Sequence, residues 1–194
     1  MVKKIVITVF SFGLLFFLFK GIKKVNFNPK FEVGQPIDSL NNVIVYFNGG
    51  VDNVEQRHTK DGYNLGLEFQ CVEFVKRYYF EHYNHKMPDS YGHAISFYDV
   101  NIKDGKLNTQ RNLSQFSNPS LTMPKEGDLI VMKGSLFNKY GHVTIVSKVN
   151  DNSVEIIQQN PGPYSSSREL FSLTKTKEGS WKINNDRILG WLRK

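Results

Sequence analysis

The chain of 194 residues contains a single cysteine, Cys71, and five histidines. A thiol attacks a carbonyl carbon as its thiolate, and the positive end of a helix dipole lowers the pKa of a thiol placed there. Cys71 opens a stretch, residues 71–82, in which apolar side chains recur with helical spacing. A thiol at the first position of an amphipathic helix is therefore a candidate nucleophile. One cysteine also excludes an intramolecular disulfide.

A cysteine nucleophile needs a base within hydrogen-bond reach, and the base needs a group that orients it. His142 follows a glycine at the mouth of a predicted strand, where its ring can project over a cleft. His82 lies about 16 Å from Cys71 along the predicted helix, too far to touch the thiol. His142 is therefore the best-placed candidate base, and His93, which follows Gly92, is a rival. The less well placed histidines are His58, His82 and His85.

The elements that must position these residues follow from hydrophobic periodicity. One face of helix 71–82 carries Cys71 with the apolar and aromatic side chains, and the other carries Glu73, Lys76, Arg77 and Glu81. A short helix is expected at 94–99 and loops at 52–64 and 100–123. Strands are expected at 43–47, 129–132, 143–149, 154–160, 169–173, 181–183 and 188–192. One helix followed by an antiparallel meander predicts an α+β domain, in which the helix that carries Cys71 packs on the sheet.

The hairpin formed by strands 143–149 and 154–160 allows a geometric prediction. Directly opposed residues of a hairpin point to the same side of the sheet. A two-residue loop would turn His142 away from Asn160. We therefore predict an odd-length or bulged turn at 151–153, which places Thr144 opposite Asn160 and His142 on the same face.

Four ordered motifs carry a resemblance to a known family. They are Gln70-Cys71-Val72-Glu73-Phe74, Glu126-Gly127-Asp128, Gly141-His142-Val143 and Gln158-Gln159-Asn160. This set resembles the CHAP family, the cysteine, histidine-dependent amidohydrolases/peptidases with a papain-like fold. Within that family the chain is most similar to glutathionylspermidine amidase domains. The resemblance covers roughly residues 40–192, nearly all of the chain beyond its N-terminal segment.

The resemblance implies a catalytic set. Cys71 would be the nucleophile, His142 the general base and then the general acid, and Asn160 the residue that orients the imidazole. Gln158 occupies a position that the family usually fills with Glu, so this chain lacks a negative charge there. Because a neutral amide can orient a histidine in papain-like sites, we expect catalysis to persist with a thiolate–imidazolium pair.

The resemblance also suggests residues that contact the substrate. The backbone N–H of Cys71 is the predicted oxyanion donor, because the first amides of a helix are unpaired. Gln70, immediately before it, is a second candidate donor. Lys76 stands where the resembling amidases carry an arginine near the substrate, so we expect it to bind a carboxylate.

The expected reaction is hydrolysis of an amide bond through a thioester acyl-enzyme. Two substrate classes stay open, an amide of the glutathionylspermidine type and a peptide of peptidoglycan. A membrane-anchored, non-catalytic binding module derived from a CHAP domain is the alternative, since the Glu expected at position 158 is absent. The chain has no CxxC, HExxH or EF-hand pattern, so we predict neither a metal nor another cofactor.

The N-terminal segment differs from the rest of the chain. Residues 5–19 form an uncharged apolar run flanked by lysines, without a small-residue cleavage site. We therefore expect residues 1–24 to be an uncleaved signal anchor, 25–41 a linker and 42–194 the amidase domain. The lysines on the two sides of the run are nearly balanced and leave the orientation open, while the signal-like start favours an exported domain at the periplasmic or extracellular face of a bacterial cell envelope.

The positive charge has the same origin. The formal net charge is +7, and residues 1–24 contribute five lysines and no acid, which leaves +2 for the remainder. A charge concentrated beside an apolar segment is not a basic face for nucleic acid. We expect a monomer whose partners are a membrane and a peptide-like or polyamine–peptide substrate.

Overall fold

The computed structural model describes residues 25–135 and 138–194. The segment predicted to be a membrane anchor, residues 1–24, lies outside the described residues. Within the described part of the chain, no helix is long and apolar enough to cross a membrane.

The N-terminal half contains two short hairpins and the helix that bears the cysteine. Its elements are β1 (Pro36–Leu40), β2 (Val43–Tyr46), β3 (Arg57–Lys60), β4 (Tyr63–Leu67), α2 (Cys71–Tyr83), the 3₁₀ helix η1 (Ala94–Phe97), β5 (Lys106–Asn108) and β6 (Leu113–Ser117). The C-terminal half is built from strands, namely β7 (Leu129–Met132), β8 (His142–Asn150), β9 (Ser153–Ile157), β10 (Arg168–Lys175), β11 (Trp181–Ile183) and β12 (Ile188–Arg193).

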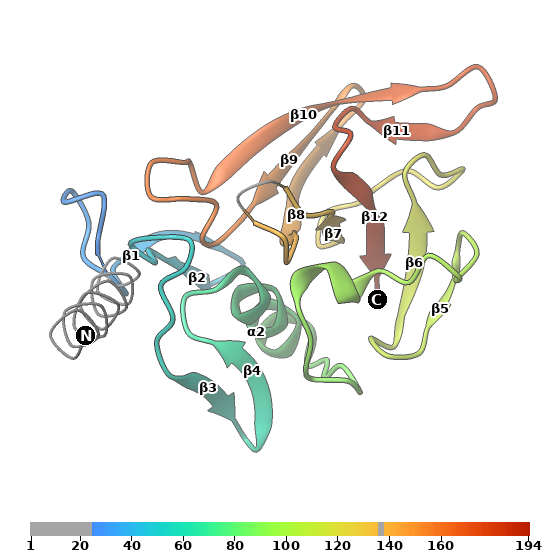
Figure 1. The fold of residues 1–194 in the computed structure, drawn as a ribbon. Coiled ribbons are helices and arrows are strands. Elements are labelled where there is room, and N and C mark those ends of the chain that lie inside the picture. Colours follow the sequence, from blue (N-terminus) through green and yellow to red (C-terminus); the bar gives the residue numbers. More distant parts are fainter. Residues whose placement is uncertain (1–24, 136–137) are drawn as a thin grey trace, which may run out of the picture.

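Eight strands form one antiparallel sheet in the order β11-β10-β9-β8-β7-β12-β6-β5. Strands β7 to β11 follow one another as the predicted meander, and β12 returns to pair between β7 and β6. The β1–β2 and β3–β4 hairpins form separate two-stranded sheets. In Figure 1, α2 lies between the β3–β4 hairpin and the large sheet, so both of its faces are covered. This is the predicted α+β arrangement, with the helix that carries Cys71 packed on antiparallel strands.

Two apolar cores lie on opposite faces of the sheet. The first joins α2 to the sheet, with Phe74 and Val75 of the helix packed in one cluster with Val143 and Ile145 of β8. Each such side chain stabilises the fold by about 1.5–3 kcal/mol when it is fully buried. The second core is a separate cluster centred on Trp191. Because successive residues of β8 point to opposite faces, His142 projects on the side of the second core.

Three predicted loop or linker segments form strands instead. The predicted linker 25–41 contains β1, which pairs with β2, the predicted loop 52–64 contains β3 and the start of β4, and the predicted loop 100–123 contains β5 and β6. Periodicity missed them because strand β3, Arg-His-Thr-Lys, is polar on both sides, and the other missed strands are three to five residues long. Their pairing partners, rather than alternating hydrophobicity, select the extended conformation.

The predicted three-residue or bulged turn at 151–153 is wrong. Asn150 pairs with Ser153, so the loop has only two residues. The register shifts further along the strand, between Val146 and Lys148, where Ser147 is an extra residue in β8. The Ser147 hydroxyl secures this bulge by donating to the Glu155 carboxylate at 2.7 Å. This bulge shifts the register by one residue, as the predicted one would have done. The side chains of His142 and of Gln158, which follows β9, therefore still point to the same face of the sheet.

The Ser147 bulge generates a prediction about the site. Deleting Ser147 removes the register shift, so we expect His142 and Gln158 to point to opposite faces and amidase activity to be lost. Ser147→Ala keeps the extra residue and should retain activity, at a stability cost of about 1 kcal/mol for the lost hydrogen bond. Activity and thermal unfolding measured on both variants would check this, and an active deletion variant would contradict it.

Candidate active site

Cys71 is the first residue of α2, as predicted, and only 8% of its surface is exposed. The backbone N–H of Val143, the residue after His142, donates to the sulfur, so the thiol lies against the first residues of β8. The first intrahelical hydrogen bond joins the Phe74 N–H to the Gln70 carbonyl. The N–H groups of the first helical turn thus point out of the helix end beside the sulfur.

His142 receives its orienting contact from Gln158, with 3.0 Å between His142 Nε2 and Gln158 Oε1. The amide nitrogen of Gln158 donates to the Ser166 carbonyl at 3.2 Å and to a Glu169 carboxylate oxygen at 3.5 Å. Because both of these partners are acceptors, Oε1 must face the imidazole, and His142 must carry its proton on Nε2. The other ring nitrogen, Nδ1, therefore keeps the lone pair that a general base needs.

Asn160, the predicted orienting residue, makes different contacts. Its side-chain nitrogen donates to Gln70 Oε1 at 2.9 Å and to the Val51 carbonyl at 3.0 Å. Its φ of 57° is left-handed, a conformation that asparagine tolerates, and it carries the side chain toward the segment before α2. The structure thus assigns the contact with His142 to Gln158 and gives Asn160 the task of holding Gln70.

The predicted substrate contacts of Gln70 and Lys76 do not match their geometry. Gln70 Nε2 donates to the Asn53 carbonyl at 2.5 Å, so this amide is committed to the loop before the site. Lys76 is buried and donates to the backbone carbonyls of Asn64 and Ser90. Both side chains bind neighbouring backbone, which leaves the Cys71 N–H as the candidate oxyanion donor.

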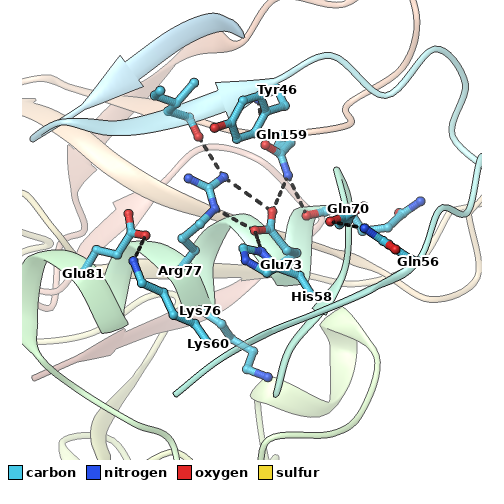
Figure 2. A network of polar contacts seen from close by, with 12 residues as sticks. Tyr46, Gln56, His58, Lys60, Gln70, Glu73, Lys76, Arg77, Glu81 and Gln159 are labelled. Carbon is cyan, nitrogen blue, oxygen red and sulfur yellow. Dashed lines mark hydrogen bonds and ion pairs between the residues drawn. The ribbon is translucent and has the colours of Figure 1, made fainter. Parts of the chain in front are cut away.

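A buried ionic network centred on Glu73 lies on the polar face of α2 (Figure 2). The Glu73 carboxylate, 2% exposed, accepts from Arg77 at 2.6 Å, from His58 at 3.0 Å and from the Gln159 amide at 2.9 Å. The same Gln159 nitrogen donates to the Gln70 carbonyl at 3.0 Å. Burial raises the pKa of Glu73, but the His58 hydrogen bond and the Arg77 charge outweigh it and lower the pKa below its usual value. The ionised Glu73 thus ties the start of α2 to the segment after β9.

Burial sets the protonation of the reacting pair. Desolvation raises the pKa of the Cys71 thiol, and the Val143 N–H only partly opposes this. Desolvation also lowers the pKa of His142 to about 4, against the opposing hydrogen bond from Gln158 and with a further decrease from the Arg187 charge. Contrary to the thiolate–imidazolium pair expected from the sequence, the free enzyme favours the neutral thiol and the neutral imidazole.

A polar cleft of about 570 Å³ opens beside His142. Its charged lining residues are Arg168, Glu169 and Arg187, and Gln158 and Asn160 also face it. Arg168 is already paired with Asp38 and Glu155, whereas Arg187 forms no ion pair with any residue in the described ranges. Within the same ranges, no three His, Cys, Asp or Glu side chains come together as a metal site.

Comparison with known proteins identifies the family. Residues 58–160, which contain Cys71, His142 and Gln158, match the family described as CHAP domain. The chain belongs to the CHAP domain family. CHAP domains are amidohydrolases and peptidases that act on amide bonds, which agrees with a thiol at the start of a helix, held against the strand that begins at the buried His142.

The curated relatives of this CHAP domain are longer proteins. The bifunctional glutathionylspermidine synthetase/amidase of Escherichia coli (strain K12) is 30% identical over 151 residues, which cover 73% of this chain and 24% of the relative. The trypanothione synthetase of Crithidia fasciculata is 28% identical over 137 residues, which cover 68% of this chain and 20% of the relative. The chain thus spans a quarter or less of the length of these relatives.

Two solved structures similar to this chain share its fold only in part. The wild-type endolysin LysIME-EF1 aligns with a TM-score of 0.39 at 20% identity, over 72% of this chain and 58% of that one. Ly7917 with the hydrolyzing product of MDP aligns with a TM-score of 0.39 at 16% identity, over 65% and 54% of the two chains.

Sequence reasoning missed several residues of this CHAP site. Glu73 and Gln159 lie inside the motifs that carried the family resemblance, but their types alone do not reveal a shared hydrogen bond across 86 positions. His58 was set aside as a loop residue, yet it binds Glu73. The polar face of α2, Glu73 in particular, was the available signal, since a buried acid requires partners.

The lowered pKa of His142 predicts how stability depends on pH. The unfolded chain binds a proton at His142 below about pH 6.5, whereas the folded protein binds it only near pH 4. Stability should therefore fall between about pH 6.5 and 4, by about 3 kcal/mol from this residue. In urea unfolding at several pH values, His142→Gln should lose less stability over this range than the wild type does.

Two further variants separate this effect from general acid sensitivity. The hydrogen bond to Glu73 raises the pKa of His58, so His58 contributes stability below its unfolded pKa that is lost at higher pH. His58→Gln should therefore lower stability by a nearly constant amount below about pH 6.5 and leave the acid loss in place, and His82→Gln at the exposed end of α2 should leave it unchanged. Identical pH profiles for the His142 variant and the wild type would contradict the prediction.

Proposed function

We propose that this CHAP domain is a cysteine amidase that hydrolyses an amide bond of a peptide-like substrate through a thioester acyl-enzyme. The observation that carries the proposal is the fixed orientation of His142. The Gln158 amide nitrogen donates to the Ser166 carbonyl and the Glu169 carboxylate, so the amide oxygen accepts from His142 Nε2. This leaves His142 Nδ1 as the basic nitrogen. A retired site would have no need to keep this tautomer, so the Gln at position 158 does not favour a binding module.

The proposed reaction begins with proton transfer from the Cys71 thiol to His142 Nδ1. The sulfur then bonds to the substrate carbonyl carbon, and the carbonyl electron pair moves to oxygen. The Cys71 backbone N–H stabilises that oxygen, in the position where helix N-terminal amides bind anions. When the carbon–nitrogen bond breaks, the imidazolium returns its proton to the leaving amine.

The thioester is removed by the reverse sequence with water. His142 Nδ1 accepts a proton from water, whose oxygen attacks the thioester carbon and releases the carboxylic acid and the thiol. Because Cys71 and His142 are both neutral in the free protein, the thiolate and the imidazolium form only when substrate is present. Substrate binding can supply the stabilisation that the empty site lacks, because the oxyanion and the imidazolium then form side by side.

The cleft supports a polar, charged substrate. Arg187 lines it without a carboxylate partner among the described residues, and serine and asparagine side chains supply hydrogen-bonding groups. Both an amide of the glutathionylspermidine type and a peptidoglycan peptide carry free carboxylates near amide bonds. The E. coli relative favours the first class, and a location in the cell envelope would favour the second.

A substrate panel with Cys71 variants tests the proposed function. We expect the full-length chain to release amine from glutathionylspermidine or from peptidoglycan, and Cys71→Ala to lower kcat by on the order of 10³-fold or more, because the nucleophile is lost. Rapid quenching and mass spectrometry should detect an acyl adduct on Cys71 in the wild type. No turnover of either substrate, or unchanged turnover by Cys71→Ala, would reject the proposal.

We also propose that residues 1–24 anchor the domain to the cell membrane, with the catalytic domain on the exported side. Support comes from the uncharged apolar run flanked by lysines. In a bacterial host the full-length chain should sediment with membranes after a high-salt wash, whereas a chain beginning at residue 25 should not. Full-length protein in the soluble fraction would contradict the anchor, and protease access to intact spheroplasts would determine its orientation.

A further inference from the structure

We propose that Glu169 is a positioning residue that stabilises protonated His142 through the side-chain amide of Gln158. The inference rests on the proposed function only for the role it gives His142 as proton carrier. At position 158 the family usually has a Glu in contact with the histidine, and this chain has Gln. In this proposal the carboxylate is supplied by Glu169, which contacts Gln158 instead of the imidazole.

The strand registers place the three residues on one face of the sheet. Beyond the Ser147 bulge, Val146 pairs with Ile156, so His142 and Gln158 lie on the same side. In the next pair of strands, Glu169 of β10 pairs with Ile156 of β9, which puts Glu169 on that side as well. Residues offset diagonally by two positions in neighbouring strands are within reach of long side chains. The backbone therefore brings Glu169 next to Gln158.

The side chains complete a continuous hydrogen-bonded path. Gln158 Oε1 accepts from His142 at 3.0 Å, and Gln158 Nε2 donates to Glu169 Oε2 at 3.5 Å. The second amide proton is taken by the Ser166 carbonyl at 3.2 Å. Both amide protons and one lone pair of the Gln158 oxygen are thus used, and the negative end of the amide dipole faces the imidazole.

The charges around His142 give this path a purpose. Arg187, before β12, lies close enough for its charge to disfavour the imidazolium. Gln158, which follows β9, and the Cys71 thiol of α2 are neutral. Arg168 of β10 is occupied by Asp38 and Glu155. Glu169 forms no ion pair with another described residue. It is therefore the carboxylate left to balance the proton that His142 gains when Cys71 attacks.

The single cysteine provides a readout that needs no substrate. Alkylation of Cys71 by iodoacetamide near pH 6–7 reports the small population of thiolate–imidazolium pair in the full-length chain. We expect Glu169→Gln to lower this alkylation rate about three- to tenfold and to lower kcat by a similar factor with little change in KM. Glu178→Gln, which removes the same charge at the far β10–β11 turn, should change neither.

A double-mutant cycle tests whether Glu169 acts through position 158. Gln158→Glu puts a carboxylate directly on the imidazole, so it should raise the alkylation rate and the pKa of His142 measured by NMR. In that background the two carboxylates repel each other across about 3.5 Å, so Glu169→Gln should no longer lower either quantity and should instead raise them. The proposal is overturned if Glu169→Gln matches the wild type, or if its effect persists at full size in the Gln158→Glu variant.

These outcomes distinguish the inference from the proposed function. If the chain turns over neither substrate but its Cys71 alkylation follows the predicted pattern, the role of Glu169 stands and the proposed function is rejected. An increase of KM without a change in alkylation would place Glu169 in substrate binding and overturn the inference.

Discussion

The site depends on the hydrogen bonds of one side-chain amide, that of Gln159. Its nitrogen bridges the Gln70 carbonyl at the start of α2 and the buried Glu73 carboxylate, and its oxygen accepts from the Tyr46 N–H. These contacts fasten the end of the helix that carries the nucleophile to the segment that follows β9. Gln158, the neighbouring residue on that segment, holds the base. Gln158 and Gln159 point to opposite sides of the same segment. This segment therefore positions both His142 and the start of the helix that carries Cys71.

Burial of Glu73 makes this fastening rigid. An unpaired carboxylate at 2% exposure would cost several kcal/mol, so Arg77, His58 and Gln159 must all remain in place while it is charged. The negative charge lies in the first turn of α2, where it also favours the helix dipole. Such a charge beside a thiol would oppose thiolate formation if it were alone. Pairing with Arg77 and His58 neutralises it, so the helix gains stability without suppressing the nucleophile.

Desolvation determines how the site holds its protons. The same burial that excludes water from Cys71 and His142 favours their neutral forms, so charge must be created during the reaction rather than stored beforehand. Groups that respond to that charge then control the rate. In the proposed mechanism the Cys71 N–H faces the developing oxyanion, and the Gln158 amide faces the developing imidazolium. In the same mechanism the amide at position 158 stabilises the imidazolium less than the family's usual carboxylate would. The charges of Arg187 and Glu169 would then determine how readily His142 is protonated.

The sequence by itself determined the helix that begins at Cys71, the strand that begins at His142 and the meander. Each is encoded locally, by helical spacing after Cys71 or by period two along the strands. The predicted position of the register shift was wrong, because a bulge can occupy any position along a hairpin and its energy depends on contacts such as that of Ser147 with Glu155.

The partners of the polar side chains were decided only by the tertiary structure. Asn160 was the predicted orienting residue, but its left-handed backbone sends it to Gln70, while Gln158 meets His142. Lys76 was expected at the substrate, but the β3–β4 hairpin buries it. Strand and helix periods report which face a residue occupies, whereas its partner depends on segments tens of residues away, whose distance in space no local pattern records.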